Sequence, residues 1–170
     1  MLLHQRRSVL TWMGATFCTP VAVANPQLDI PTGPMILSMA GKVSGQRAGR
    51  VDFDAAMIDA MPQHNIRATT PWYKDSQMFS GPLLNDVLHA ARATGEKLKL
   101  VALNDYAVEV PVSDAEQYRP VIARKINGKV LSVRDKGPLF LMYPFDDYPS
   151  IRNDIYYARC IWQLNRITVL

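Results

Sequence analysis

Polar and hydrophobic residues alternate with a period of two in two stretches of the chain, residues 97–103 and 161–169, which is typical of β-strands. Residues 97–103 alternate and then become apolar, which predicts a strand entering a core, and residues 107–112 are its expected partner. Asn127 and Gly128 form a dipeptide that favours a tight hairpin turn. Further short apolar or alternating runs predict strands at residues 35–39, 51–53, 65–70, 121–123, 129–133, 139–143 and 161–169.

Short helices are predicted between these strands. Asp54 has the side chain of an N-cap for a helix over residues 54–61. Residues 79–82 are expected to form a turn that opens a second helix, with Ser80 or Gly81 as its N-cap. The order Ser-x-x-Glu in residues 113–116 predicts a capping box and a third helix.

These patterns predict one α+β domain with mixed, largely antiparallel sheets and short helices. The chain has 170 residues, enough for one domain, and its twelve prolines and nine glycines indicate many turns. The acidic and aromatic stretch at residues 143–157 is expected to be a long surface loop, with a partner-binding face as the less favoured interpretation.

The first 24 residues have the layout of an export signal. Arg6 and Arg7 precede an apolar run at residues 9–23, and Ala22-Val23-Ala24 is a small-x-small cleavage site. The run is short for a membrane span. We therefore expect a periplasmic protein with a single domain over residues 25–170 and no membrane insertion after cleavage. Residues 6–10 are close to a twin-arginine motif, so both Tat and Sec export stay open.

Removal of this segment lowers the formal net charge from +4 to +2, because it takes away two arginines and no acid. Such a small charge does not indicate nucleic-acid binding. Cys160 would then be the one remaining cysteine, which excludes an intramolecular disulfide, and it is expected to be a small buried hydrophobic residue. No His-x-His or Cys-x-x-Cys spacing and no triad-like spacing of Ser, His and Asp occurs, so we predict no catalytic residue.

Residues 64–72, His-Asn-Ile-Arg-Ala-Thr-Thr-Pro-Trp, resemble the cofactor strand of the sulfite oxidase family of molybdenum enzymes. In that family an Arg-Cys pair is followed four residues later by Trp, and the Cys thiolate binds molybdenum. Arg67 and Trp72 keep this spacing, but Ala68 stands at the Cys position. An alanine methyl group cannot ligate a metal, so no protein-ligated metal is expected.

The resemblance to this molybdopterin-binding domain covers nearly all of residues 25–170. It rests on the order of several segments, of which none is decisive alone. Besides residues 67–72 these are residues 79–84, 102–106, 134–139 and 162–167. The resemblance implies a mixed α+β fold around a cofactor cleft, and a pterin or molybdopterin as the ligand.

Trp72 is a candidate for stacking on a flat pterin ring, with a core tryptophan as an equally weighted alternative. Asp105 is a candidate acceptor for the donors on the pyrimidine edge of a pterin, and Asn104 offers both a donor and an acceptor. An Asx turn closing a hairpin is the favoured alternative for Asn104. Tyr106 is a second possible stacking face.

A second group of candidates lies in the turn before Pro138. Arg134, Lys136 and Gly137 match the family's turn, and the charged side chains suit the phosphate of the cofactor. A solvated turn with an internal salt bridge is the alternative. Arg67 is expected either to serve the same pocket or to pair with an acid such as Asp105.

The resemblance leads to a binding module as the first hypothesis. It would be a periplasmic, non-catalytic pterin-binding regulator that acts on the periplasmic part of a membrane enzyme controlling cyclic-di-GMP. An oxidoreductase, or a subunit of one, that holds molybdenum through the cofactor's dithiolene alone is the second hypothesis. A scaffold with a vestigial, empty cleft is the third.

Overall fold

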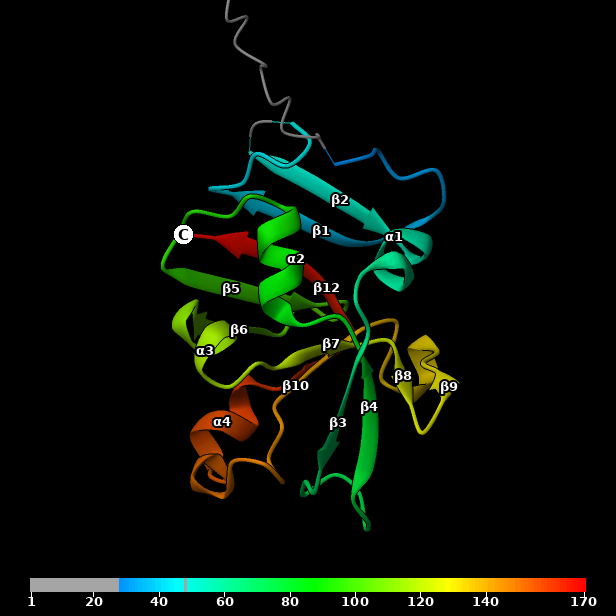
Figure 1. Cartoon of the computed structure of the whole chain (residues 1–170), viewed down its shortest axis with the longest axis vertical. Coiled ribbons are helices and arrows are strands. Elements are labelled where there is room, and N and C mark those ends of the chain that lie inside the picture. Colours follow the sequence, from blue (N-terminus) through cyan, green and yellow to red (C-terminus); the bar gives the residue numbers. More distant parts are fainter. Residues whose placement is uncertain (1–27, 48) are drawn as a thin grey trace, which may run out of the picture.

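The computed structural model describes residues 28–47 and 49–170, and the predicted export signal at residues 1–24 lies outside these ranges (Figure 1). In the described residues the chain forms an α+β domain of mostly antiparallel sheets with a few short helices, which confirms the predicted fold class. No helix in these ranges is long and apolar enough to cross a membrane.

The largest sheet has five strands in the order β2-β1-β12-β5-β6. Its β1–β12 pair is parallel, and its other pairs are antiparallel. In β5, Leu98 and Leu100 are buried while Lys97 and Lys99 are exposed, as the alternation predicts. The strands are β1 (Met35–Gly41), β2 (Arg50–Asp54), β5 (Lys97–Ala102), β6 (Ala107–Pro111) and β12 (Leu164–Val169).

Two smaller sheets complete the domain, in the orders β11-β10-β7 and β3-β4-β8-β9. The β3–β4 hairpin extends away from the five-stranded sheet, on the same side as α4 (Figure 1). The strands are β3 (His64–Ala68), β4 (Gln77–Gly81), β7 (Val121–Ala123), β8 (Lys125–Ile126), β9 (Lys129–Val130), β10 (Phe140–Met142) and β11 (Ile161–Trp162). The helices are α1 (Ala55–Ala60), α2 (Leu84–Ala90), α3 (Ser113–Gln117) and α4 (Asp154–Arg159), with 3-10 turns η1 (Val133–Asp135) and η2 (Pro149–Ile151).

Two predictions that concern only a few neighbouring residues are confirmed. Asp54 caps α1, because its side chain accepts a hydrogen bond from the Met57 N–H at 2.9 Å. Asn127 and Gly128 both have positive φ, 49° and 78°, as a two-residue type I′ hairpin between β8 and β9 requires.

The predicted turn at residues 79–82 is wrong. Residues 77–81 form β4, which pairs with β3 and β8, and α2 begins only at Leu84. The chain continues to pair with its neighbour after β4. The Pro82 carbonyl accepts a hydrogen bond from the Ile122 N–H at 2.9 Å. Gly81 lies directly against this neighbour: a Cβ atom there would sit 2.1 Å from the Ile122 carbonyl oxygen. Long-range pairing therefore overrides the local turn signal.

The predicted capping box is also wrong. Ser113 lies inside α3, and Val112 takes the N-cap position without a side-chain hydrogen bond. The next residue, Asp114, is buried and accepts hydrogen bonds from Tyr143 and Arg159, so side chains outside α3 contact its first turn.

The predicted strand at residues 161–169 divides at Gln163, whose φ is +54°. β11 before it belongs to the three-stranded sheet, and β12 after it belongs to the five-stranded sheet. The predicted loop at residues 143–157 contains η2 and the start of α4. The side chain of Asn153 caps this helix by accepting from the N–H groups of Ile155 and Tyr156.

Stability at acid pH is expected to depend on Asp54. Hydrogen bonds from the N–H groups of Met57, Gly33 and Thr32 hold the pKa of this carboxyl below its usual range. Its contribution is therefore full above the unfolded pKa of about 4 and is lost as the pH falls through the lower folded pKa.

Denaturant unfolding followed by circular dichroism, from neutral pH to about pH 2, measures this effect. The Asp54→Asn variant should be less stable at neutral pH and should lose less stability on acidification than the parent. Parallel curves for the two proteins would show that Asp54 is not the group responsible.

Candidate functional site

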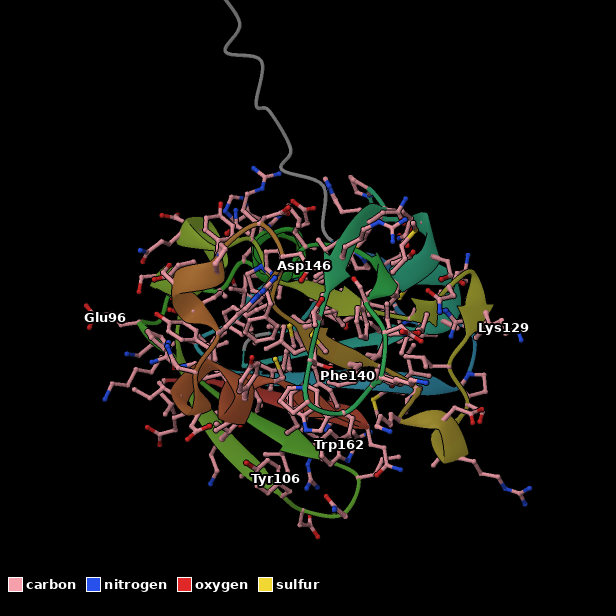
Figure 2. The ribbon with its side chains drawn as sticks, turned by 90° about the horizontal axis from the view of Figure 1, so that it is seen from below. Glu96, Tyr106, Lys129, Phe140, Asp146 and Trp162 are labelled. Atoms are coloured by element: carbon pink, nitrogen blue, oxygen red, sulfur yellow. The ribbon has the colours of Figure 1, made fainter. Side chains whose placement is uncertain are left out.

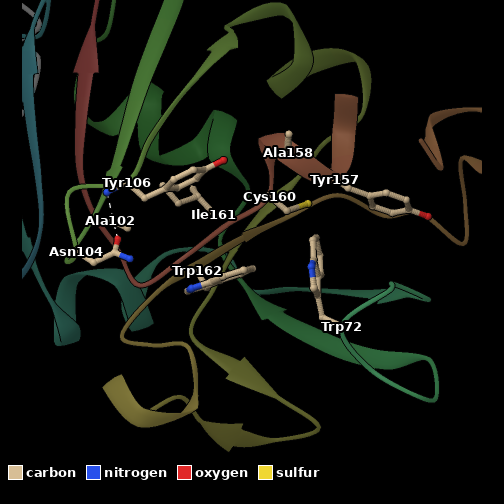
Figure 3. A pocket seen from close by; sticks show the side chains of 9 residues that line it. All are labelled: Trp72, Ala102, Asn104, Tyr106, Tyr157, Ala158, Cys160, Ile161 and Trp162. Carbon is tan, nitrogen blue, oxygen red and sulfur yellow. Dashed lines mark hydrogen bonds between the residues drawn. The ribbon is translucent and has the colours of Figure 1, made fainter. Parts of the chain in front are cut away.

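A pocket of about 380 Å³ opens beside the five-stranded sheet, within the volume range of small-molecule sites (Figure 3). Three separate segments build it: the turn between β5 and β6, the loop between β3 and β4, and the segment from α4 into β11. The lining residues are Trp72, Ala102, Asn104, Tyr106, Tyr157, Ala158, Cys160, Ile161 and Trp162.

Aromatic rings dominate the wall. The ring centroid of Trp72 lies 5.9 Å from that of Tyr157 and 5.9 Å from that of Trp162, both with edge-to-face geometry. Trp72 also packs on the buried Phe140, with the centroids 6.1 Å apart, so it contacts the core as well as the pocket. Phe140, Trp162 and Tyr106 follow one another from the centre of the molecule toward its edge (Figure 2). The wall is therefore suited to a flat, partly exposed ligand.

Asn104 supplies a directed polar group. Its Oδ1 accepts from the Tyr106 N–H at 3.2 Å, which is the contact of an Asx turn, the favoured alternative in the sequence analysis (Figure 3). Its Nδ2 has no hydrogen-bond partner among the described residues and remains available to a ligand. Asn104 thus shapes the β5–β6 turn through its oxygen and presents its amide donors at the pocket.

Asp105 lies beside these residues but does not line the pocket. It has a positive φ of 63°, its side chain is 81% exposed, and its carboxylate pairs with Arg166. Arg67 does not pair with it; Arg67 is exposed on β3, opposite Met78. The structure therefore gives Asp105 a surface ion pair at the edge of the site.

Ala68 is completely buried in β3, opposite Gln77. It is not among the lining residues, so its methyl group belongs to the core behind the loop that carries Trp72.

Arg134, Lys136 and Gly137 also lie outside the lining. Arg134 is exposed in η1, and the Lys136 ammonium sits 5.1 Å from the centroid of the Tyr73 ring, a cation–π contact. Gly137 approaches the backbone of Leu131 so closely that a Cβ atom would lie 2.5 Å from its carbonyl oxygen. The turn is joined to the chain next to the lining residue Trp162 by Gln163, whose N–H donates to the Lys136 carbonyl and whose Nε2 donates to the Val133 carbonyl, both at 2.9 Å.

Six of the lining residues were not predicted as site residues: Ala102, Tyr157, Ala158, Cys160, Ile161 and Trp162. Cys160 is 3% exposed, and burial raises the pKa of its thiol to about 12. Its sulfur lies 4.0 Å from that of Met142. Cys160 thus contributes a neutral, soft surface to the pocket rather than a thiolate.

The lining contains no Asp, Glu, Lys, Arg or His side chain. In residues 28–47 and 49–170, no three His, Cys, Asp or Glu side chains gather in a way that suits a metal ion. No protein-family model matches the sequence, and the curated proteins include no match to it. The resemblance to the molybdopterin-binding domain therefore stays a prediction.

Proposed function

We propose that the protein binds a pterin in the pocket lined by Trp72, Tyr106, Tyr157 and Trp162, and that it does so as a non-catalytic regulator. One observation carries the proposal: the aromatic wall and the free Asn104 amide meet in one pocket without an ionised side chain. These features suit a flat, neutral heterocycle that has hydrogen-bonding atoms along one edge.

The parts of a pterin match the parts of the pocket. The bicyclic ring offers a π-face to one of the indoles of Trp72 and Trp162, and the other indole, whose plane is turned by 78° from the first, suits the edge of the ring. Its carbonyl oxygen and those ring nitrogens that carry no hydrogen are acceptors, which suit the two N–H groups of Asn104. The neutral thiol of Cys160 adds polarizable contact surface without charge.

Molybdenum is a poorer fit to these residues. Ala68 occupies the position that resembles the family's thiolate ligand, and its methyl group is buried away from the lining. Cys160 is in the wall, but its thiol holds its proton at neutral pH. We therefore propose the pterin without protein-ligated metal as the ligand.

The biological setting in this proposal follows from the resemblance and from residues 1–24. The protein would be exported to the periplasm, and occupancy of the pocket would change its affinity for the periplasmic part of a membrane enzyme that controls cyclic-di-GMP. Such a link requires that the ligand bind the partner-competent conformation more tightly than the other conformation.

The content of the purified protein tests the proposal. We expect a fluorescent pterin to be released on denaturation, with far less than one molybdenum per chain by elemental analysis. About one molybdenum per chain would overturn the proposal in favour of an oxidoreductase. A purified protein that contains no metal and no pterin, and that does not bind added pterins, would also overturn the proposal. That result would favour a scaffold. A Lys129→Ala variant, altered in the exposed β8–β9 hairpin, is the matched control and should carry the same pterin content.

A further inference from the structure

α4 forms one wall of the pocket but has no buried side chain of its own. It has six residues, and it presents Tyr157 and Ala158 to the pocket. The ring of Tyr157 packs 4.9 Å from that of Phe145 and 5.9 Å from that of Trp72. A helix this short is not stable by itself, so contacts outside it must fix its position.

The C-terminal end of α4 is held by a buried carboxylate on another helix. Arg159 donates from Nη1 to Oδ2 of Asp114 in α3 at 2.7 Å. The hydroxyl of Tyr143 donates to the same oxygen at 2.6 Å. The Asp114 side chain is 5% exposed, so solvent competes little for these bonds. Arg159 also lies over the Tyr156 ring, 4.6 Å from its centroid.

Asp114 is not a lining residue of the pocket, and its carboxylate accepts hydrogen bonds from Tyr143 and Arg159, which do not line the pocket either. Yet Arg159 follows Tyr157 by two positions on the same short helix. Loss of the carboxylate charge would leave the guanidinium without its charged partner and would remove one of the anchors of this end of α4. The other anchor is Tyr156, whose ring packs on those of Tyr118 and Tyr143.

We infer that Asp114 is a positioning residue for the pterin pocket: through Arg159 it holds α4 so that Tyr157 closes the wall against Trp72. This inference rests on the proposed function. Asp114 sets the affinity for the pterin without contacting it.

A double-mutant cycle tests this inference. Asp114→Asn keeps the size of the side chain and removes its charge, and it should weaken pterin binding about tenfold. In a Tyr157→Ala background the same change should have almost no further effect, because Asp114 acts through Tyr157. In an Asn104→Asp background, which alters a lining residue that is not on α4, the two losses should multiply. Pterin affinity is measured for each variant by quenching of tryptophan fluorescence.

Two further variants separate positioning from general loss of stability. Asp59→Asn removes the Asp59–Arg124 ion pair, also 2.7 Å long, at a place remote from α4, and should leave the affinity unchanged. Arg159→Lys keeps the charge but loses the planar guanidinium, and replaces Asp114→Asn in the cycle if that variant does not fold.

Equal affinity of the wild type and Asp114→Asn would overturn the inference. So would a loss from Asp114→Asn that is as large in the Tyr157→Ala background as in the wild type. A wild-type protein that binds no pterin would instead defeat the proposed function, so the two failures are distinguishable.

Discussion

Replacing Trp72 with alanine is expected to weaken pterin binding by about 1–3 kcal/mol, up to about a hundredfold, the range measured for loss of a ring that stacks on a base. Trp72 contacts Tyr157 and Trp162 in the wall and Phe140 behind it. Its removal takes away a stacking surface and loosens both neighbouring rings. The measurement is a titration of purified protein with a fluorescent pterin.

The control must separate the pocket from the core, because Trp72 packs on both. Trp72→Phe keeps a ring and should retain part of the affinity. Tyr148→Ala removes another half-buried ring, one that packs on Tyr118 and does not line this pocket, and should bind like the parent. If Trp72→Ala folds and binds pterin as tightly as the parent, the pocket that Trp72 lines is not the pterin site.

The second large effect concerns stability. Gly81→Ala is expected to destabilise the fold by more than about 3 kcal/mol, or to prevent folding. The new Cβ atom would stand 2.1 Å from the Ile122 carbonyl oxygen, which is a backbone atom and cannot swing aside. β4 is fixed by pairing with β3 and β8, and β7 is fixed by pairing with β10. Denaturant unfolding measures the loss.

Gly128→Ala is the matched control for Gly81. Gly128 has a positive φ of 78°, but nothing lies within 4 Å of a Cβ atom built there. Only backbone strain opposes the substitution, so its cost should be about 1–2 kcal/mol. An effect of Gly81→Ala no larger than that of Gly128→Ala would show that β4 and β7 can separate easily.

Local chemistry was enough to predict the elements whose cause is local. The side chain of Asp54 reaches an N–H group three residues away, and the hairpin at Asn127 and Gly128 needs only two residues with positive φ. The alternation in β5 follows from one buried face of a sheet. In each of these places, the residues whose sequence pattern predicts the element lie close together in the chain. The same residues also form the hydrogen bonds or the buried face that stabilises the element.

Elements that depend on distant partners were predicted poorly. Residues 79–82 have a turn-like composition but pair with residues around 122, some 40 positions away. Gln163 gives no sign in the sequence that the chain changes sheets there, since its neighbours continue the alternation.

The candidate site divides in the same way. Trp72, Asn104 and Tyr106 come from two turns, and the structure brings them into one pocket. Asp105, Arg67, Ala68, Arg134, Lys136 and Gly137 lie outside its lining. The sequence analysis predicts a loop where α4 forms, although Asn153 as an N-cap, with the apolar and aromatic residues 155–158 after it, is a usable helix signal.

The parallel pairing of β1 with β12 has a consequence for how fast the domain folds. Ser38 pairs with Arg166, a separation of 128 residues, so this contact closes one of the longest loops that the domain contains. Closing such loops before any compensating contacts form slows folding.

Until β12 is in place, the sheet exists as two separate hairpins, β1–β2 and β5–β6. The inner edges of β1 and β5, which β12 later joins, are then open to pairing with other chains. A chain in which β12 has not yet docked is therefore expected to aggregate more readily than the finished fold.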